Sequence, residues 1–186
     1  MKLGLYGGGF KPFHTGHFAK LLLALDEVGE EGKVISFFGI KKQKFSDKTG
    51  KPLKTKFRKF GDGPNARPFN QEMQEEIVSI YEDALESAFP GKLDIVPSAD
   101  EPPLTKIFNV LNSFAYQNMS EEERQNLLED IPQAPSGQRL EGFDMNNIEE
   151  IVVVAGSDEV DKTYIAGINR QAEKSEILSY FNIDDG

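Results

Sequence analysis

The stretch KLGLYGGGFKPFHTGHF, residues 2–18, decides the fold because it passes from an apolar run through glycines into a helical pattern. A short apolar run that ends in glycines is typical of a buried strand followed by a tight turn. From Phe18 to Val28 the apolar residues recur at helical spacing, and Gly29 follows them as a common helix stop. The stretch therefore predicts a strand, a tight turn and a helix that begins near Phe18.

Three further apolar runs are rich in β-branched and aromatic residues and predict buried strands at 34–38 (VISFF), 93–96 (LDIV) and 151–155 (IVVVA). Strands that alternate with helices favour a parallel sheet, because each crossover returns the chain to the same edge. We expect an α/β fold with a doubly wound, mostly parallel sheet of Rossmann-like type. Ligands of such sheets bind beyond the carboxyl ends of the strands, where the strand order reverses.

A second helix is predicted between Asn70, a good N-cap residue, and Pro90 with Gly91, which end it. Apolar residues at helical spacing predict the face of this helix that packs against the sheet. The residues expected on that face are Met73, Ile77, Ile80, Tyr81, Ala84 and Ala88.

The sequence between the third and fourth expected strands is more polar. Leu104 to Phe114 has a helical pattern, and Ser120 with Glu123 forms the spacing of a capping box for another helix. The polar stretch from about 117 to 147 contains prolines and glycines and is expected to be an insertion or lid outside the core.

The length and composition predict a single domain. A chain of 186 residues with 38% hydrophobic residues can bury a single core. No apolar run approaches the roughly 18 residues that a membrane span needs, and the first residues lead directly into a strand. There is no cysteine, which excludes disulfides and thiolate chemistry. We expect an unprocessed, soluble protein in the cytoplasm, without a membrane partner.

The net charge of −10 makes a nucleic acid an unlikely partner, yet the charge is unevenly distributed. Residues 41–60 hold nine Lys and Arg residues against the single acid Asp47, and the remainder holds twelve basic and thirty acidic residues. One interpretation is a solvated loop. The other is a segment that is mobile without ligand and contacts phosphates or an anionic partner when it orders.

Both histidines of the chain, His14 and His17, lie at the junction between the expected first strand and the expected first helix. A helix N-terminus presents unpaired backbone N–H groups and partial positive charge, which favour phosphate. Glycines at 7–9 allow close backbone approach, and Gly16 leaves space between the two rings. Two imidazole donors fixed at such a place can stabilise the charge that develops in phosphoryl or nucleotidyl transfer.

The run from Gly8 to His17 resembles the GxFxPxHxGH signature of the HxGH nucleotidyltransferase superfamily, which includes cytidylyltransferases, pantetheine-phosphate adenylyltransferase and nicotinamide-mononucleotide adenylyltransferases. The segment Pro12-Phe13-His14 looks most like the last of these. The resemblance implies that a phosphate-bearing small molecule attacks the α-phosphate of ATP or CTP, with Mg²⁺ assisting and pyrophosphate leaving. It implies catalytic roles for His14, His17 and Lys11, and nucleotide binding by Gly8, Gly9, Phe10 and Gly16.

The stretch Gly156-Ser157-Asp158 looks like the G-x-D turn of the same superfamily, so Gly156 and Asp158 are also expected to bind the nucleotide. Alone, such a stretch is equally typical of a turn in which Asp158 caps the backbone. The superfamily's ISSTxxR helix, which binds the outer phosphates, has no counterpart here. We therefore expect a truncated chain or one completed by another chain, and a homo-oligomer is possible.

Several alternatives remain. A zinc site would need carboxylates to complete two histidines, and the glycines do not match a dinucleotide or Walker motif, because Pro12 stands where the third glycine should be. A fragment of a class I aminoacyl-tRNA synthetase has a related signature, but the acidic balance argues against tRNA. The main alternative is a nucleotidyltransferase-like domain that has lost turnover and acts as a binding or assembly module.

Overall fold

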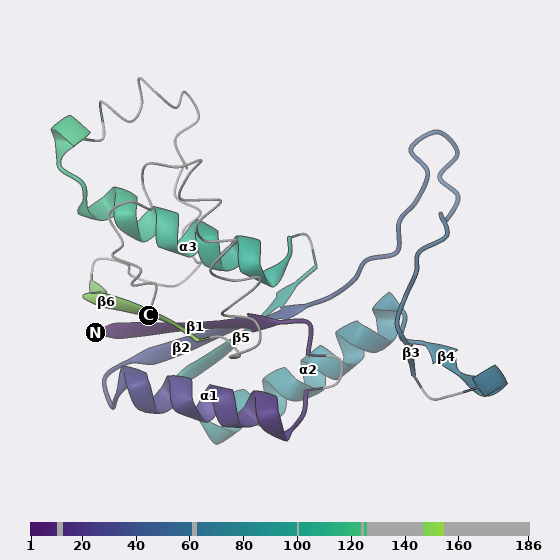
Figure 1. Cartoon of the computed structure of the whole chain (residues 1–186), viewed down its shortest axis with the longest axis horizontal. Helices are drawn as coiled ribbons and strands as arrows, with labels where there is room; N and C mark the ends of the chain where they lie inside the picture. The colour runs from purple at the N-terminus through teal and green to yellow at the C-terminus, as the bar shows by residue number, and fades with distance from the viewer. Residues whose placement is uncertain (11–12, 61–62, 100, 124, 126–146, 155–186) are drawn as a thin grey trace.

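The computed structural model describes residues 1–10, 13–60, 63–99, 101–123, 125 and 147–154. Four strands form its central sheet: β1 (Lys2–Gly8), β2 (Lys33–Gly39), β5 (Leu93–Ser98) and β6 (Glu150–Val154). They lie in the order β5-β2-β1-β6, and every neighbouring pair is parallel (Figure 1). The predicted α/β fold with a parallel sheet is confirmed.

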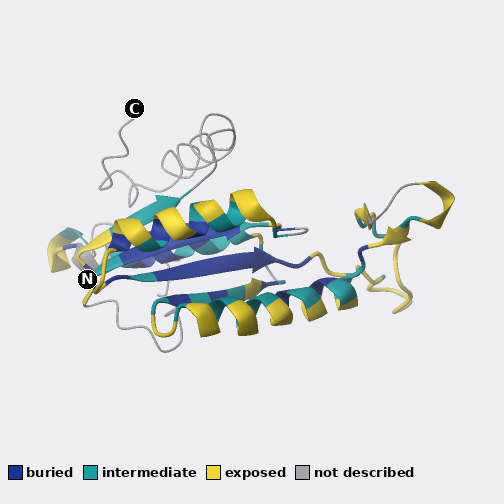
Figure 2. Cartoon of the chain, turned by 90° about the horizontal axis from the view of Figure 1, so that it is seen from below, coloured by how far each residue is buried: buried dark blue, intermediate teal, exposed yellow. Residues whose placement is uncertain are grey.

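Helices cover both faces of this sheet. On one face lie α1 (Thr15–Val28) and α2 (Gln71–Ala88), and α3 (Pro103–Asn118) lies on the other (Figure 1). Alternate residues of a strand point to opposite faces, so Leu3 and Leu5 pack with α3 while Tyr6 packs with α1. The strands are buried between the layers, and the helices turn their exposed residues outward (Figure 2).

The strand order reverses at β1. The chain first adds β2 and β5 on one side of β1, and β6 then pairs with the other side, with Tyr6 opposite Val154. The segments that leave the carboxyl ends of β1 and β6 therefore start at the same edge of the sheet. Such a reversal point is where open α/β sheets bind ligands.

The first helix begins earlier than the apolar pattern predicts. α1 starts at Thr15 rather than near Phe18, because His14 acts as its N-cap residue. The second helix begins as predicted, since Asn70 is the N-cap and its Oδ1 accepts the Met73 backbone N–H at 3.0 Å. The capping box at Ser120 is also present, with Glu123 Oε2 2.7 Å from the Ser120 backbone nitrogen.

The predicted buried face of α2 is correct only in part: Tyr81 packs against the core and Met73 and Ile77 are half-buried, but the other three residues are not. Ile80, which we placed on it, is 57% exposed, and Ala84 and Ala88 are exposed as well. The helix instead buries Gln74 and Val78, and Tyr81 and Leu85 pack against the core on the same side. The helix is rotated because Gln74, a polar residue, forms buried hydrogen bonds that hold neighbouring backbone.

The basic segment leaves the carboxyl edge of the sheet as a projection. We call residues 41–69 the basic arm; it contains the short strands β3 (Lys59–Phe60) and β4 (Arg67–Pro68) and the 3₁₀ turn η1 (Gly63–Asn65). Phe45 pairs with Pro52 across its outer hairpin. The basic arm extends away from the sheet and its helices (Figure 1).

Glutamine side chains brace the base of the basic arm. Gln43 Nε2 donates to Leu53 O at 2.7 Å and lies 3.1 Å from Thr55 Oγ1, which ties the two sides of the hairpin together. The backbone N–H of Gln43 donates to Gln71 Oε1 at 2.8 Å. The arm is thus hydrogen-bonded to the first turn of α2, and its mobility without ligand stays a prediction.

Replacing Gln74 by alanine should lower the free energy of unfolding by about 2 kcal/mol, because it removes two hydrogen bonds that a buried side chain makes to the backbone. The Gln74 side chain is 2% exposed, accepts the Lys41 N–H at 2.8 Å and donates to Phe69 O at 2.7 Å. Urea unfolding measures the loss, and amide exchange should quicken at Lys41. The matched control is the exposed Ser79→Ala on the same helix; equal losses for the two variants would contradict the bracing role.

Within the described part of the chain, no helix has both the length and the apolar character needed to cross a bilayer.

Candidate functional site

The two histidines interlock at the first turn of α1. His14 Nδ1 accepts the Gly16 backbone N–H at 3.1 Å, and His17 Nδ1 accepts the His14 backbone N–H at 3.2 Å. Together these bonds form a capping box built from imidazoles in place of the usual hydroxyl and carboxylate. The two rings stack, with centroids 3.7 Å apart and planes inclined by 26°.

This capping box fixes which nitrogen of each ring can donate. A backbone N–H that points at Nδ1 requires a lone pair there, so the proton of the neutral ring is on Nε2. Both imidazoles are therefore held as Nε2–H donors, side by side. His14 is exposed and His17 is half-buried, so the pair lies at the surface of the sheet's carboxyl edge. Two imidazole donors held close together at a helix N-terminus are suited to hydrogen-bond a phosphoryl group.

A cluster of aromatic side chains packs against the ring of His17. Phe10 is 7% exposed, and its ring lies 5.0 Å from that of His17 and 4.4 Å from that of Phe38. Phe13 packs between His17 and Tyr81, with centroid distances of 5.6 and 5.4 Å. Phe10 also has a φ of 38°, in the left-handed region that a bulky residue avoids. Strain of this kind persists only where surrounding packing enforces it.

The glycines of the first loop have different environments. The side-chain space of Gly7 is filled by α3, since a Cβ there would lie 3.0 Å from Ile107 Cδ1 and 3.1 Å from Pro103 Cβ. Gly8 is covered by the ring of Phe10, at 2.7 Å from such a Cβ. Gly9 is exposed and has no atom within 4 Å of that position. Of the three, Gly9 is therefore the one open to close approach by a ligand.

Gly16 serves the histidine pair directly. Its N–H is the donor that holds His14, and a Cβ on Gly16 would lie 3.1 Å from His14 Cε1. Contact at that distance is tighter than most side chains tolerate, so a larger residue would push the His14 ring aside. The role that the structure supports for Gly16 is to leave room for this ring.

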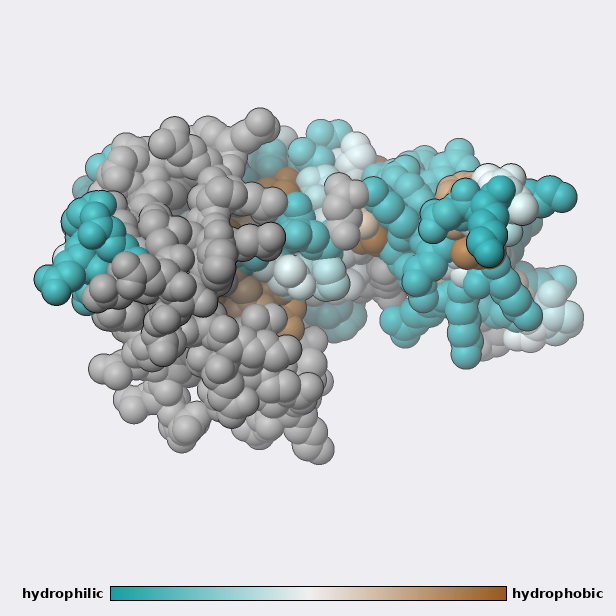
Figure 3. Space-filling view, turned by 90° about the horizontal axis from the view of Figure 1, so that it is seen from above, coloured by the Kyte–Doolittle hydropathy of each residue, from teal (hydrophilic) through white to brown (hydrophobic). Residues whose placement is uncertain are grey.

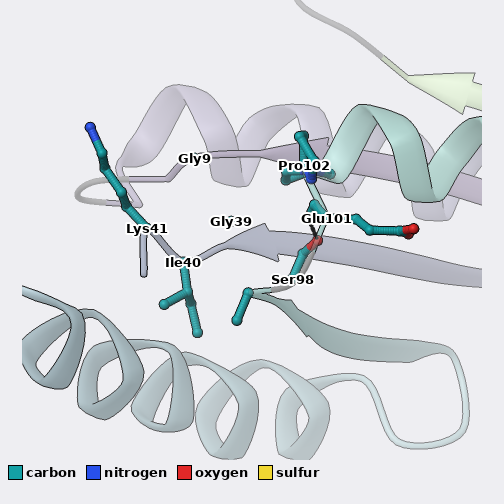
Figure 4. Close-up of a pocket in the computed structure, with 9 residues that line it drawn as sticks. Gly9, Gly39, Ile40, Lys41, Ser98, Glu101 and Pro102 are labelled. Atoms are coloured by element: carbon teal, nitrogen blue, oxygen red, sulfur yellow. Dashed lines mark hydrogen bonds between the residues drawn. The ribbon is translucent and has the colours of Figure 1, made fainter. Parts of the chain in front are cut away.

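A pocket of ≈ 290 Å³ opens beside Gly9 at the same edge (Figure 4). The carboxyl ends of β1, β2 and β5 and the start of α3 form its walls. Ser98 Oγ donates to Glu101 O, which ties the end of β5 to the turn before α3. The lining residues are Gly9, Gly39, Ile40, Lys41, Ser98, Ala99, Glu101, Pro102 and Pro103.

The pocket and the histidine pair are neighbours at one edge, but they are not the same cavity. The pocket lies toward α3 and the histidines cap α1, on the opposite face of the sheet, with Gly9 in the chain between them. Lys41 is the residue of the basic arm that lines the pocket, and its Nζ donates to Lys56 O at 2.6 Å. Sequence reasoning missed Gly39 and Ser98, although each follows a predicted parallel strand, whereas Lys41 belongs to the basic segment that was expected to contact an anion.

The charges at this edge favour an anion near the histidines. The first turn of α1 contains no acidic residue, so the positive end of the helix is not neutralised from within that turn. Among the described residues, no group of three or more His, Cys, Asp or Glu is placed to hold a metal ion.

The remaining predicted site residues, Lys11, Gly156 and Asp158, lie outside the described residues. The strand β6 that precedes the last two ends at Val154, at the edge that carries the histidines.

Comparison of the chain with protein-family models, with curated proteins and with solved structures found no match.

Proposed function

We propose that this protein is a nucleotidyltransferase, which transfers a nucleoside monophosphate from ATP or CTP to a phosphate-bearing small molecule and releases pyrophosphate. The observation that carries the proposal is the interlocked pair of His14 and His17. Their Nδ1 atoms are occupied by the backbone of α1, so both rings present Nε2–H donors at a helix N-terminus. The parallel sheet with reversed strand order supports a Rossmann-like nucleotidyltransferase class.

In the proposed reaction an acceptor phosphate oxygen attacks the α-phosphorus of the triphosphate. A bond forms from this oxygen to phosphorus, and the bond from phosphorus to the bridging oxygen of pyrophosphate breaks. The two Nε2–H groups donate to non-bridging α-phosphate oxygens, whose share of negative charge grows as the five-coordinate phosphorus forms. Because these donors are positioned beforehand, no reorganisation is needed at the barrier. The open backbone at Gly9 allows the phosphates to approach the loop.

The proposal also assigns roles to Mg²⁺, to the other predicted site residues and to the pocket beside Gly9. Mg²⁺ arrives with the triphosphate, since this ion prefers phosphate oxygens and water to an all-protein cage. Lys11 adds positive charge beside the α-phosphate, and Gly156 with Asp158 holds the nucleoside. The pocket beside Gly9 has room for part of the acceptor.

The experiment that tests the proposed function is an acceptor-dependent release of pyrophosphate. The purified chain is incubated with Mg²⁺ and either ATP or CTP, with and without phosphomonoester acceptors such as mononucleotides, sugar phosphates and amino-alcohol phosphates. We expect one nucleotide and one acceptor class to give pyrophosphate in equal amount to a condensed product. Release that does not depend on any acceptor, or no release in any combination, would contradict the proposal.

A second candidate is a nucleotide-binding or assembly module without turnover. The observation that favours it is the absence from the sequence of an ISSTxxR motif for the outer phosphates. Calorimetry with ATP and CTP, with and without Mg²⁺, separates the two candidates. Tight binding without acceptor-dependent release supports the module, whereas binding followed by release supports the enzyme.

A further inference from the structure

The basic arm concentrates positive charge and exposed apolar surface in one projection. Its nine Lys and Arg residues between 41 and 59 are all exposed, and residues 41–60 contain one acid. Phe45 and Leu53 in the outer hairpin are 57% and 48% exposed. Figure 3 shows the arm as a mostly hydrophilic projection with small apolar patches. Exposed apolar residues are common singly, so the feature that distinguishes this projection is its concentration of positive charge.

The outer side of α2 has the opposite charge and a similar apolar centre. Glu72, Glu76, Ile80 and Asp83 follow one another at helical spacing, all four are exposed, and we call them the acidic stripe. Ile80, 57% exposed, lies between two acids because the helix buries Gln74 and Val78 on its other side. Negative charge is crowded along this helix. Partial burial, together with Glu86 and Asp83, raises the pKa of neighbouring Glu82 above its ordinary value.

We propose that the basic arm of one copy of this chain docks on the acidic stripe of a second copy. The two surfaces match in charge sign, and each places exposed aliphatic or aromatic side chains among its charges. The base of the basic arm is bonded to the first turns of α2, but its outer hairpin projects away from this helix and is open to a second copy (Figure 1). Opposite charges of this kind steer encounter and fix the pairing of surfaces.

A second copy fits the basic arm better than a nucleic acid does. The arm ends at Phe69, and α2 begins two residues later with Glu72, Glu75 and Glu76 in its first two turns. A polyanion that followed the arm would meet these carboxylates at the base. The acidic stripe is only about 17 Å long at the rise of an α-helix, so the stripe of another copy can contact the lysines of the outer hairpin without reaching the base.

The proposed contact joins the basic arm of one copy to the acidic stripe of the other, and each copy has both surfaces. Two copies related by a two-fold axis satisfy both contacts at once, since the arm of each reaches the stripe of the other. The resulting closed dimer needs no third surface. This inference does not depend on the proposed enzymatic activity.

The test is sedimentation velocity of the full chain over a range of concentrations and salt. At an ionic strength of about 0.02 M, where charges interact over roughly 20 Å, we expect a concentration-dependent dimer, and added salt should dissociate it. Lys48→Glu with Lys51→Glu and Lys54→Glu (the arm variant), or Glu76→Lys with Asp83→Lys (the stripe variant), should each weaken dimerisation at least about tenfold. An equimolar mixture of the two variants should dimerise more tightly than either variant alone, because the outer hairpin of the arm variant, residues 44–54, then holds one lysine and four acids and faces the lysines of the stripe variant.

The matched control is Glu30→Lys with Glu31→Lys, two exposed acids outside both surfaces that change the net charge as the stripe variant does. This control should dimerise as the wild type does, and circular dichroism should show that all variants fold. A wild type that stays monomeric at low salt overturns the proposal, as does a mixture of variants that fails to reassociate. A monomer that binds a single-stranded homopolymer oligonucleotide would also overturn it, and would identify a polyanion as the partner.

Discussion

His14→Ala and His17→Ala should each lower kcat at least about a hundredfold, the usual loss when a preorganised donor to a developing charge is removed. The KM for the triphosphate should change much less, because the donors act most strongly when the α-phosphorus is five-coordinate. Both side chains also cap α1, through the bonds to Gly16 and His14 backbone nitrogens. The alanine variants therefore combine loss of a donor with loss of a cap, and a second pair of variants is needed.

His14→Asn and His17→Gln separate capping from catalysis. Asparagine is a good N-cap acceptor, and glutamine at the third helical position can reach back to the N-cap N–H. These variants should keep the stability of α1 and still lose kcat, because an amide does not place a donor where imidazole Nε2 lies. Thr15→Ala, an exposed change in the same turn, should leave kcat unchanged. If the histidine variants keep near wild-type kcat and lose only affinity, the pair binds nucleotide without assisting the reaction.

Phe10→Ala should lower the free energy of unfolding by roughly 3 kcal/mol, the usual cost of truncating a buried phenylalanine. Its ring contacts Tyr6, Phe13, Phe38 and His17 and fills the space beside Gly8. The left-handed φ of Phe10 is strained for alanine as well, so the loss of packing is not offset by relief of the backbone. Because His17 rests on this ring, kcat should fall together with stability.

Urea unfolding measures the first effect, and the matched control is Phe45→Ala in the basic arm. Phe45 is 57% exposed, so its truncation should change the unfolding free energy by no more than about 0.5 kcal/mol. A loss below about 1 kcal/mol for Phe10→Ala would show that the aromatic cluster does not depend on this ring. Unchanged kcat at a temperature where the variant is folded would show that His17 is positioned by other contacts.

The parallel sheet could be predicted from sequence because each of its strands is a short, largely apolar run, and three of the four are rich in β-branched or aromatic residues. Asn70 marked the start of α2 for a similar reason, since its side chain is a common acceptor at a helix N-terminus. The apolar periodicity begins only at Phe18, but His14 and His17 were expected at the N-terminus of this helix, and the structure has them in its first turn. No sequence pattern predicted that each Nδ1 would accept a backbone N–H, and it is from these bonds that we infer a proton on each Nε2.

The orientation of α2 could not be predicted, because a pattern of apolar residues selects Ile80 for the buried face and leaves the polar Gln74 outside it. The hydrogen bonds that bury Gln74 come from Lys41 and Phe69, which are distant in sequence and meet only in the fold. Gly7 and Gly8 were expected to allow a ligand to approach the loop, and the space beside them could not be judged from the sequence either. That Ile107 and Phe10 fill the space beside them depends on packing between elements, which no local pattern records.

The most direct test of the account is to follow the label of a nucleoside triphosphate through the reaction, with the label placed either on the α-phosphate or on the γ-phosphate. Product separation is carried out for ATP and CTP with the acceptor that supports pyrophosphate release. Nucleotidyl transfer predicts that the α label enters the condensed product and the γ label leaves in pyrophosphate, and that His14→Asn and His17→Gln lose both signals together. A γ label that enters the product, or an α label that stays entirely with the nucleotide for every acceptor, would contradict the proposed role of His14 and His17.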